Sequence, residues 1–218
     1  MSEIIVAIDG YSGTGKSSTA KIVAEKLGYT YIDSGAMYRA ITLFLLKNNI
    51  DIQNLNEVES TLDECELKFD KEGIWLNEEL VEDQIRAMDV NNAVSHISAI
   101  SAVRTKLVAE QRKMSSNKGV VMDGRDIGTV VFPNAELKIF MTADMDIRID
   151  RRKKQLASKG IIESKEKIAE NLVERDRIDT SREDSPLAKA KDAIEIDTSH
   201  ITLDQQIDKI VQLANELR

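Results

Sequence analysis

Eight residues near the start of the chain have the types and spacing of a loop that binds phosphate. Residues 10–17 read Gly-Tyr-Ser-Gly-Thr-Gly-Lys-Ser, which fits the pattern G-x-x-x-x-G-K-[ST]; we call them the P-loop. Glycines let the backbone wrap closely around an anion, and the loop's N–H groups attract one. In such a loop Lys16 reaches the β- and γ-phosphates of a nucleoside triphosphate, and the Ser17 hydroxyl ligates Mg²⁺. The residues expected to contact the nucleotide are Gly10, Ser12, Gly13, Thr14, Gly15, Lys16, Ser17 and Ser18.

The flanks of the P-loop favour a phosphate site over an ordinary glycine-rich turn. Residues 4–8 form an apolar run that predicts a strand. After the P-loop, apolar residues at i, i+3, i+4 and i+7 predict an amphipathic helix that ends near Gly28; they are Ala20, Val23, Ala24 and Leu27. The N-terminus of such a helix attracts an anion. The sequence therefore predicts binding of a nucleoside triphosphate.

Arginines recur at helical spacing later in the chain, although its net charge is −8. One set is Arg148, Arg151 and Arg152, and the other is Arg175, Asp179 and Arg182. Transfer of a phosphoryl group needs cations around the moving charge, and arginine binds phosphate with two parallel hydrogen bonds. For the first set, a solvated helix face rich in Asp is an equally good interpretation. For the second set the solvated-face interpretation is weaker, because its segment shows no apolar stripe of its own.

Two acidic stretches are further candidates, and for both the residues alone leave alternatives open. In Asp33-Ser34-Gly35-Ala36-Met37-Tyr38-Arg39, the first two residues either cap a helix or mark an anion site that Arg39 reaches. In residues 123–128, Asp-Gly-Arg-Asp-Ile-Gly follows a buried strand. Asp123 could contact Mg²⁺ through water, and Asp126 could accept hydrogen bonds from a base or a ribose. The alternative is a tight Asp-Gly turn.

The elements that must position these residues alternate between strands and helices, which predicts an α/β fold with a central parallel sheet flanked by helices. Further strands are expected at 30–32, 119–122, 137–142 and 193–196, and helices at 36–47, 81–116, 145–158, 164–178 and 203–217. Pro186 opens a short turn or helix. Residues 50–85 differ, because 62–69 and 74–80 predict short strands around a turn at Lys71-Glu72-Gly73. We expect a small, mostly antiparallel insertion there.

Composition excludes several classes of protein. The net charge of −8 disfavours nucleic acid as a partner, and no apolar run approaches the length of a membrane span. The only cysteine, Cys65, is expected to be buried rather than reactive and suits the cytoplasm. Two histidines without a cysteine cluster give no basis for a zinc site.

Taken together, the motifs resemble those of bacterial cytidylate kinases, which are P-loop nucleoside monophosphate kinases, over nearly the whole chain. The resemblance rests on the P-loop, residues 33–39, Val94-Ser95 with Val103-Arg104, residues 123–128, and Arg175-Asp176 through Arg182 to Pro186-Leu187. The insertion at about 50–85 also resembles the enlarged monophosphate-binding domain of that family. The P-loop is shared by many enzymes, whereas residues 33–39 and 123–128 together are far more specific.

The resemblance implies transfer of the ATP γ-phosphate to CMP or dCMP with Mg²⁺. By matching positions, Ser34, Arg104, Asp126 and Arg182 would surround cytosine, Ser95, Arg175 and Asp179 would hold the sugar, and Arg39 and Arg125 would bind the acceptor phosphate, with Gly124 beside it. Lys16, Arg125, Arg152 and Arg175 would be catalytic, and Ser17 with Asp123, through water, would hold the metal.

The resemblance also implies a division of the chain. Residues 1–33, 118–145 and 184–218 would form a P-loop kinase core, 34–117 a monophosphate-binding region, and 146–183 a helical lid that closes on the donor and excludes water. We expect a cytoplasmic monomer, because two lobes closing over a cleft need no partner subunit.

Two positions depart from the family pattern. Tyr11 stands where proline is common, which predicts altered lid contacts, and Ile178 stands where some members carry arginine, so Arg177 or Arg152 would compensate.

Two other functions compete with the cytidylate kinase. One is a P-loop kinase for another monophosphate or small molecule. The other is a nucleotide-binding regulatory or nucleic-acid-associated protein, against which the acidic charge balance counts.

Overall fold

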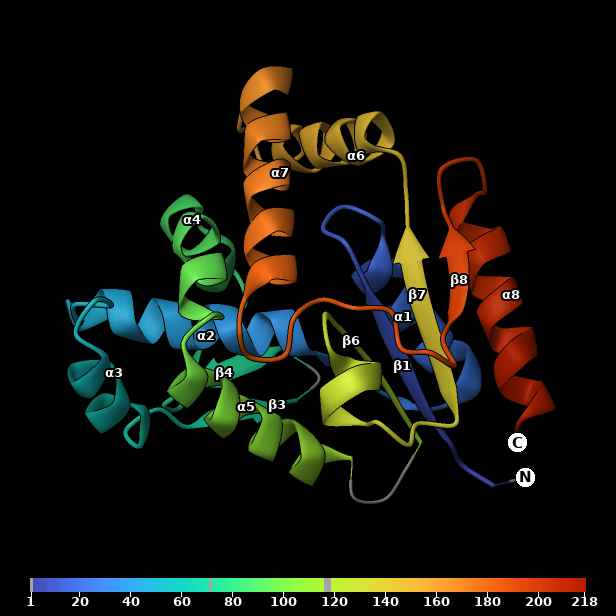
Figure 1. Ribbon diagram of the computed structural model, residues 1–218, viewed down its shortest axis with the longest axis horizontal. Coiled ribbons are helices and arrows are strands. Elements are labelled where there is room, and N and C mark those ends of the chain that lie inside the picture. Colours follow the sequence, from blue (N-terminus) through green and yellow to red (C-terminus); the bar gives the residue numbers. More distant parts are fainter. Residues whose placement is uncertain (1, 71, 116–118) are drawn as a thin grey trace. The chain divides into compact units, whose positions relative to one another are not determined.

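The computed structural model describes residues 2–70, 72–115 and 119–218, and the chain forms two compact units. The first unit comprises Met1–Ile32 and Ser115–Arg218, and the second comprises Asp33–Met114. The predicted core, monophosphate-binding region and lid stay predictions as functional parts. Figure 1 labels most of the elements of both units.

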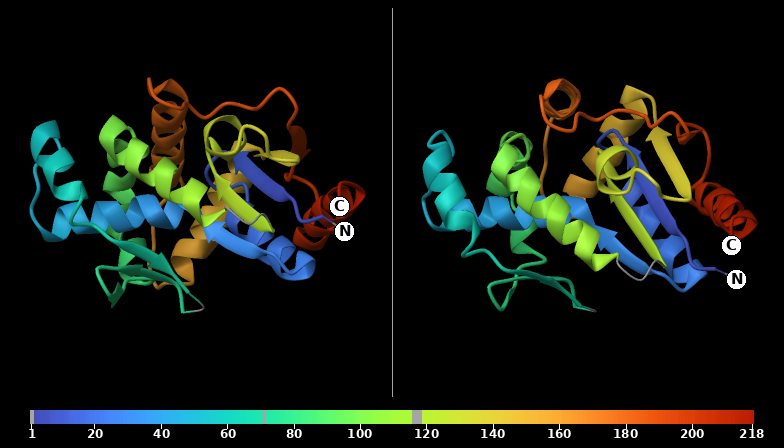
Figure 2. Two further views of the ribbon diagram at one scale, coloured as in Figure 1. Left: turned by 90° about the horizontal axis from the view of Figure 1, so that it is seen from below. Right: turned by 60° about the horizontal axis from the view of Figure 1, so that its bottom comes forward.

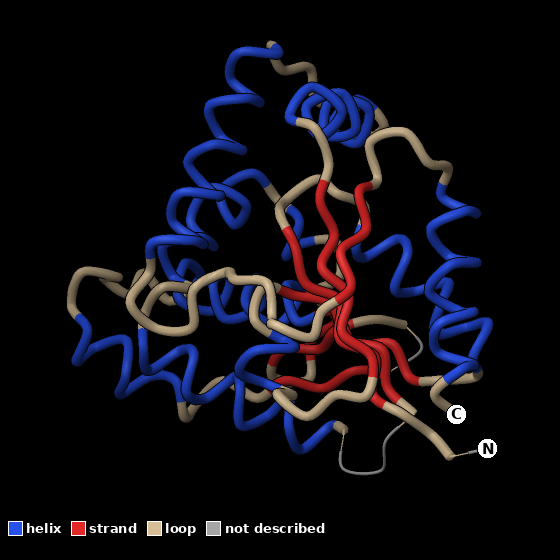
Figure 3. Tube along the Cα trace, turned by 45° about the vertical axis from the view of Figure 1, so that its right-hand side comes forward, coloured by secondary structure: helices blue, strands red, loops and turns tan. Residues whose placement is uncertain are grey.

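A five-stranded sheet with the strand order β2-β6-β1-β7-β8 forms the centre of the first unit, and Figure 3 shows its strands side by side. The strands are β1 (Ile5–Gly10), β2 (Thr30–Asp33), β6 (Val120–Gly124), β7 (Leu137–Thr142) and β8 (Ile194–Asp197). β1 pairs in parallel with β6 and β7, and β7 pairs in parallel with β8. Because Asp9 is in register with Gly124, the P-loop and the turn after β6 leave the same edge of the sheet.

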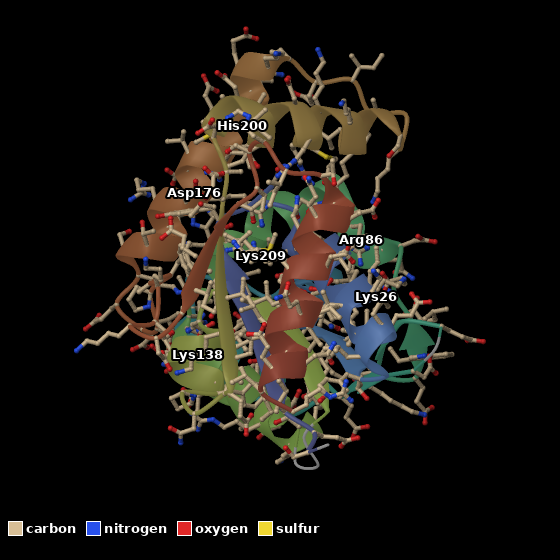
Figure 4. All side chains as sticks on the ribbon, turned by 90° about the vertical axis from the view of Figure 1, so that its right-hand side faces the viewer. Lys26, Arg86, Lys138, Asp176, His200 and Lys209 are labelled. Atoms are coloured by element: carbon tan, nitrogen blue, oxygen red, sulfur yellow. The ribbon has the colours of Figure 1, made fainter. Side chains whose placement is uncertain are left out.

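Helices cover both faces of this sheet. The helices of the first unit are α1 (Lys16–Leu27), the π-helix η2 (Ile127–Val131), α6 (Met145–Ala157), α7 (Lys165–Ser181) and α8 (Leu203–Glu216). α1 and α8 pack on one face around Ile8, Val23, Ile139 and Ile210; Figure 4 shows α8 in front of the strands. η2 packs against β1. A separate apolar cluster joins α6 to α7 through Ile149, Leu156, Ile168 and Leu172.

The second unit is built around a long buried helix. Its helices are α2 (Ser34–Lys47), α3 (Leu55–Leu62), the 3-10 helix η1 (Gln84–Arg86), α4 (Met88–Ile97) and α5 (Ser101–Met114). Its strands β3 (Leu67–Phe69), β4 (Ile74–Leu76) and β5 (Glu79–Leu80) pair antiparallel and lie together in Figure 2. α2 contacts α4, α5, η1 and β4. Ten of the 14 residues of α2 are buried, including six in succession from Ala40 to Leu45, so this helix is the core of the unit.

Short polar residues and glycine set the ends of several helices. Asp33 caps α2 and accepts a hydrogen bond from the Ala36 amide at 2.9 Å. Ser164 caps α7, and Thr202 forms a reciprocal capping box at the start of α8. Gly28 ends α1 with a φ of 71°, as the sequence predicted. These local signals explain why most predicted boundaries are correct to within a few residues.

Three predictions about elements are wrong. Residues 55–62 form helix α3, which was not predicted, because Asn54 caps it and Val58 and Leu62 bury one face; the strand expected at 62–69 is limited to β3 at Leu67–Phe69. The predicted helix at 81–116 is interrupted at residues 98–100 and divides into η1, α4 and α5. Pro186 opens no helix. The predicted turn at residues 71–73 and the predicted helix end at 116 fall partly outside the described residues.

Helix α7 also corrects the analysis of the second arginine set. It does carry a narrow apolar stripe, because Ile168 and Leu172 are buried against α6. Two residues in a long charged helix were too weak a signal to recognise. Arg182 lies at the C-cap with an extended ψ of 144°, so it reaches Asp179 from the following turn rather than from the helical face.

Candidate functional site

The backbone of the P-loop needs glycine at two places that define its shape. Gly10 has a φ of 144°, and a Cβ atom there would overlap the Met141 carbonyl on β7. Gly15 is the N-cap of α1 with a φ of 94° and has no side chain with which to cap the helix. The first turn of α1 therefore offers its N–H groups to a ligand rather than to its own cap, as an anion site requires.

Lys16 is folded back onto the P-loop. Its Nζ donates a hydrogen bond of 2.6 Å to the Tyr11 carbonyl, which also accepts from the Thr14 hydroxyl at 3.0 Å. Burial, together with the charge of Arg125, lowers the pKa of Lys16 well below its ordinary value. A buried ammonium with only a carbonyl partner gains from an added phosphate, because the negative charge offsets the cost of burial.

Arginines of α6 hold the outer carbonyls of the P-loop. Arg148 Nε donates to the Ser12 carbonyl at 2.6 Å, and Arg151 Nη1 donates to the Thr14 carbonyl at 3.1 Å. Arg148 also forms a 2.6 Å ion pair with Asp176 on α7, a residue labelled in Figure 4. The interpretation of these two arginines as a solvated face is therefore wrong, since both are bound to the P-loop.

Tyr11 contributes to the same junction with its ring. The Arg148 guanidinium lies over the ring at 5.4 Å from its centroid, and Phe140 of β7 meets the ring edge-on at 5.9 Å. The departure from proline thus places an aromatic contact between the P-loop and α6, as predicted. Arg152, the third arginine of the set, is half-buried, and its Nη1 donates to Gln155 Oε1 at 2.7 Å.

A hydroxyl and a carboxylate meet at the start of α1. Asp123 Oδ2 accepts from the Ser17 hydroxyl and Asp123 Oδ1 accepts from the Tyr31 hydroxyl, both at 2.8 Å. Oxygen atoms of this kind are the ligands that Mg²⁺ prefers, completed by water and phosphate oxygens. Over the described residues no group of three or more His, Cys, Asp and Glu could by itself hold a metal ion. No signal in the sequence indicated Tyr31. It lies on β2, and it reaches Asp123 because β2 and β6 are neighbouring strands in the sheet.

Four charged side chains of the first unit form a buried cluster after β6 and at the end of α7. Arg125 Nε donates to Asp179 at 2.7 Å, while Arg182 lies 3.6 Å from Asp179 and 3.9 Å from Asp126. Burial alone would raise the pKa of Asp179, but the charges of Arg125, Arg182 and Arg175 outweigh it and lower that pKa. The neighbouring arginines therefore favour the ionised form of the Asp179 carboxylate.

The two flanks of this cluster fix its geometry. Arg125 Nη1 donates to the Gly124 carbonyl at 3.3 Å, and Arg182 Nε donates to the Ser185 carbonyl at 2.8 Å.

Arg175 is half-buried on α7. Arg177, one candidate to compensate for Ile178, is instead exposed and paired with Glu174 at 2.7 Å, while Ile178 is buried.

The remaining predicted site residues belong to the second unit. Ser34 is buried at the first position of α2, and Arg39 is folded over Gly35, where an added Cβ would lie 3.1 Å from Arg39 Nη1. Ser95 is buried on α4. The candidate site residues thus fall into two sets, one in each unit.

Arg104 connects three helices of the second unit. Its guanidinium lies over the Tyr38 ring of α2 at 5.5 Å, and its Nη1 donates to the Ser98 carbonyl after α4 at 3.1 Å. The residue itself is on α5 and is 3% exposed. Its guanidinium is therefore held in a fixed orientation before any ligand binds, and sequence reasoning missed the aromatic partner.

Comparisons with known proteins agree with one another on the family. A family model described as cytidylate kinase matches residues 6–216. A cytidylate kinase of Flavobacterium psychrophilum is 50% identical, with all of both chains covered. One of Cytophaga hutchinsonii is 50% identical over 98% of this chain and 94% of that protein. One of Clostridioides difficile is 42% identical over 99% of this chain and all of that protein.

Solved structures show the fold at lower similarity. An uncharacterised protein from Eubacterium ventriosum has a TM-score of 0.53 at 15% identity and covers 98% of this chain and 99% of its own. A gluconokinase from Sinorhizobium meliloti has a TM-score of 0.50 at 14% identity and covers 99% of this chain and 93% of its own. At such identities the likeness concerns the fold alone.

Proposed function

The chain belongs to the cytidylate kinase family, and we propose that it transfers the γ-phosphoryl group of ATP to CMP or dCMP, forming ADP and CDP or dCDP. The observation that carries the proposal lies in the first unit. There the P-loop with Lys16 follows β1, and Arg125 follows the adjacent strand β6, where it pairs with Asp179 near the end of α7. A donor site and a set of cations for the transferred group are thus built on one rigid scaffold.

The donor end is assigned to the P-loop and its neighbours. ATP phosphates would take the place of the Tyr11 carbonyl as partner of Lys16, and the first-turn amides of α1 would bind them from the other side. Ser17 would ligate Mg²⁺, and Asp123 would hold a water of its shell. When bound, the metal neutralises charge on the β- and γ-phosphates.

The contacts to the acceptor are assigned from the positions that match the motifs of the family. Asp126 would accept a hydrogen bond from the amino group of cytosine, with Arg182, Ser34 and Arg104 toward its ring acceptors. A uracil would present a carbonyl to Asp126 instead, leaving buried groups mismatched. The remaining contacts are assigned to Ser95, Arg175 and Asp179 for the sugar and to Arg39, Gly124 and Arg125 for the phosphate.

The transfer itself needs no covalent intermediate. An oxygen of the CMP phosphate attacks the γ-phosphorus in line, a new P–O bond forms, and the bond to the β-phosphate oxygen breaks, so ADP leaves. Lys16, Arg125, Arg152 and Arg175 would stabilise the charge on the three equatorial oxygens. Residues 146–183 would close over the donor and exclude water that could hydrolyse ATP.

The test is turnover with ATP and Mg²⁺ against CMP, dCMP, UMP, AMP, GMP and dTMP in a coupled assay for ADP. Dominant rates with CMP and dCMP are expected. Strong turnover of another acceptor, or no turnover of any acceptor while ATP still binds, would contradict the acceptor assignment.

Light scattering during gel filtration tests the accompanying proposal that the enzyme is a monomer. No described helix has the length and hydropathy to cross a bilayer.

A further inference from the structure

A buried carboxylate that no motif singled out lies directly before the P-loop. Asp9, the penultimate residue of β1, is 4% exposed. Its Oδ1 accepts the Ile127 amide at 2.8 Å, and its Oδ2 accepts the Gly128 amide at 2.7 Å. Both oxygens are therefore occupied by the backbone of a turn that is 118 residues away in the sequence.

The turn held by Asp9 carries the residues assigned to the acceptor. Ile127 follows Asp126 directly, and Asp126 and Arg125 precede η2 in a segment without regular structure. Asp126 has φ −144° and ψ 22°, and its side chain makes no cap for η2. The two bonds to Asp9 therefore fix the peptide that immediately follows the Asp126 Cα.

Gly128 packs closely against both Lys138 and Asp9. A Cβ atom on Gly128 would lie 3.2 Å from Cδ of Lys138 and 3.4 Å from Oδ2 of Asp9. Lys138, labelled in Figure 4, is itself fixed by a 2.6 Å bond to the Pro133 carbonyl and a 2.8 Å ion pair with Asp192. The turn has no room to shift toward the sheet.

We propose that Asp9 is a positioning residue for recognition of the acceptor base: by binding the Ile127 and Gly128 amides it sets the direction in which Asp126 meets the amino group of cytosine. The proposal rests on the proposed function and assigns to it a residue outside the acceptor site. Selection between an amino group and a carbonyl depends on the placement of one carboxylate, and a shift of about 1 Å there is costly.

The first test substitutes Asp9→Asn, which keeps the shape but replaces one acceptor oxygen with an NH₂ donor, so that one amide loses its partner. The expected result is a fall of roughly tenfold in the ratio of kcat/KM for CMP to that for UMP, with the KM for ATP within about twofold of wild type. A ratio within twofold of wild type would overturn the proposal. So would a uniform loss with both acceptors.

A second variant and a control separate positioning from loss of stability. Gly128→Ala adds one methyl group against Lys138 and is expected to lower the same ratio even if Asp9→Asn does not fold. Ile210 lies on the buried face of α8, far along the chain from the turn. Ile210→Val removes one methyl group there and should leave the ratio unchanged. A fall in the ratio for Ile210→Val would mean that general loosening is the cause.

Hydrogen exchange makes the inference independent of the enzyme assay. In Asp9→Asn, the amide of Ile127 or Gly128 that loses its acceptor is expected to exchange at least tenfold faster than in wild type, while the β1 and β6 amides are unchanged. Unchanged exchange at both positions would overturn the proposal. If wild type shows no turnover of CMP while exchange changes as expected, the proposed function fails and the structural role of Asp9 stands.

Discussion

Among single residues, Arg125 is the side chain whose surroundings are most closely matched to one task. It is bound to Asp179 at 2.7 Å, and Asp179 also pairs with Arg182. The ion pair with Asp179 therefore holds the Arg125 guanidinium in a fixed direction. A preorganised cation of this kind stabilises developing charge without reorganisation.

Arg125→Ala is therefore expected to lower kcat for CMP by roughly 10²–10³-fold. Arg182 remains beside Asp179, so we expect the variant to fold, which thermal unfolding checks. Arg177→Ala is the matched control, because that arginine is exposed and paired only on the helix surface with Glu174. It should stay within about twofold of wild type. Near-normal kcat for Arg125→Ala would remove this residue from the catalytic set.

Asp126→Ala tests the base rather than the phosphoryl group. Because the carboxylate is assigned to the cytosine amino group, its removal should lower the preference for CMP over UMP by about tenfold or more, mainly by loss of rate with CMP. Initial rates with both acceptors measure this preference. A preference equal to that of wild type would exclude Asp126 from the base site.

Among the elements, α6 is bound to the P-loop more closely than a simple lid would be. Arg148 joins the Ser12 carbonyl, Asp176 of α7 and the Tyr11 ring. Arg151 adds the Thr14 carbonyl. Any movement of α6 must therefore displace hydrogen bonds of the P-loop, which links closure of this element to the donor phosphates.

Arg148→Ala should break this connection. Loss of a buried partner of Asp176 is expected to lower the free energy of unfolding by on the order of 3 kcal/mol and to raise the KM for ATP more than the KM for CMP. Denaturant unfolding and steady-state kinetics measure the two effects. Lys165→Met, which removes an exposed pair with Asp150, should change neither. A raised KM for CMP alone would contradict the assignment of Arg148 to the donor side.

For the whole molecule, the buried carboxyl of Asp9 should leave a signature in the pH dependence of stability. Burial raises the pKa of Asp9 from 3.8 to about 7, against the opposing effect of its two amide donors and of Lys16, and with help from the nearby charge of Asp126. At a pH between these two pKa values, the Asp9 carboxyl is protonated to a greater extent in the folded protein than in the unfolded chain. Its contribution to stability is therefore largest at low pH and falls as pH rises toward 7.

The test measures the free energy of unfolding of wild type and of Asp9→Asn at several pH values from about 4.5 to 8, and takes the difference between the two proteins. The difference should fall as pH rises to about 7 and then become constant. Other groups cancel in the difference when they titrate alike in both proteins. A difference that rises over this range would mean that the pKa of Asp9 is not raised by folding.

Local patterns were sufficient to predict the P-loop, the alternation of strands and helices and the helix ends at Gly28 and Asp33, because these depend on glycine conformation, side-chain periodicity and short-range capping. Sequence spacing also identified the family, since residues 33–39 and 123–128 are specific motifs. Sequence spacing did not predict helix α3 at 55–62. This helix is short and buries only Val58 and Leu62, so its periodic signal is weak.

What only the tertiary structure decided is which of these residues meet. The pairing of β1 with β6 brings Asp9 to the Gly128 amide and places Ser17 against Asp123, and the packing of α6 carries Arg148 to the Ser12 carbonyl. Each contact joins residues more than 100 positions apart. A sequence determines the types and local spacing of side chains, whereas contacts of this range depend on the burial of apolar faces, which selects one packing among many.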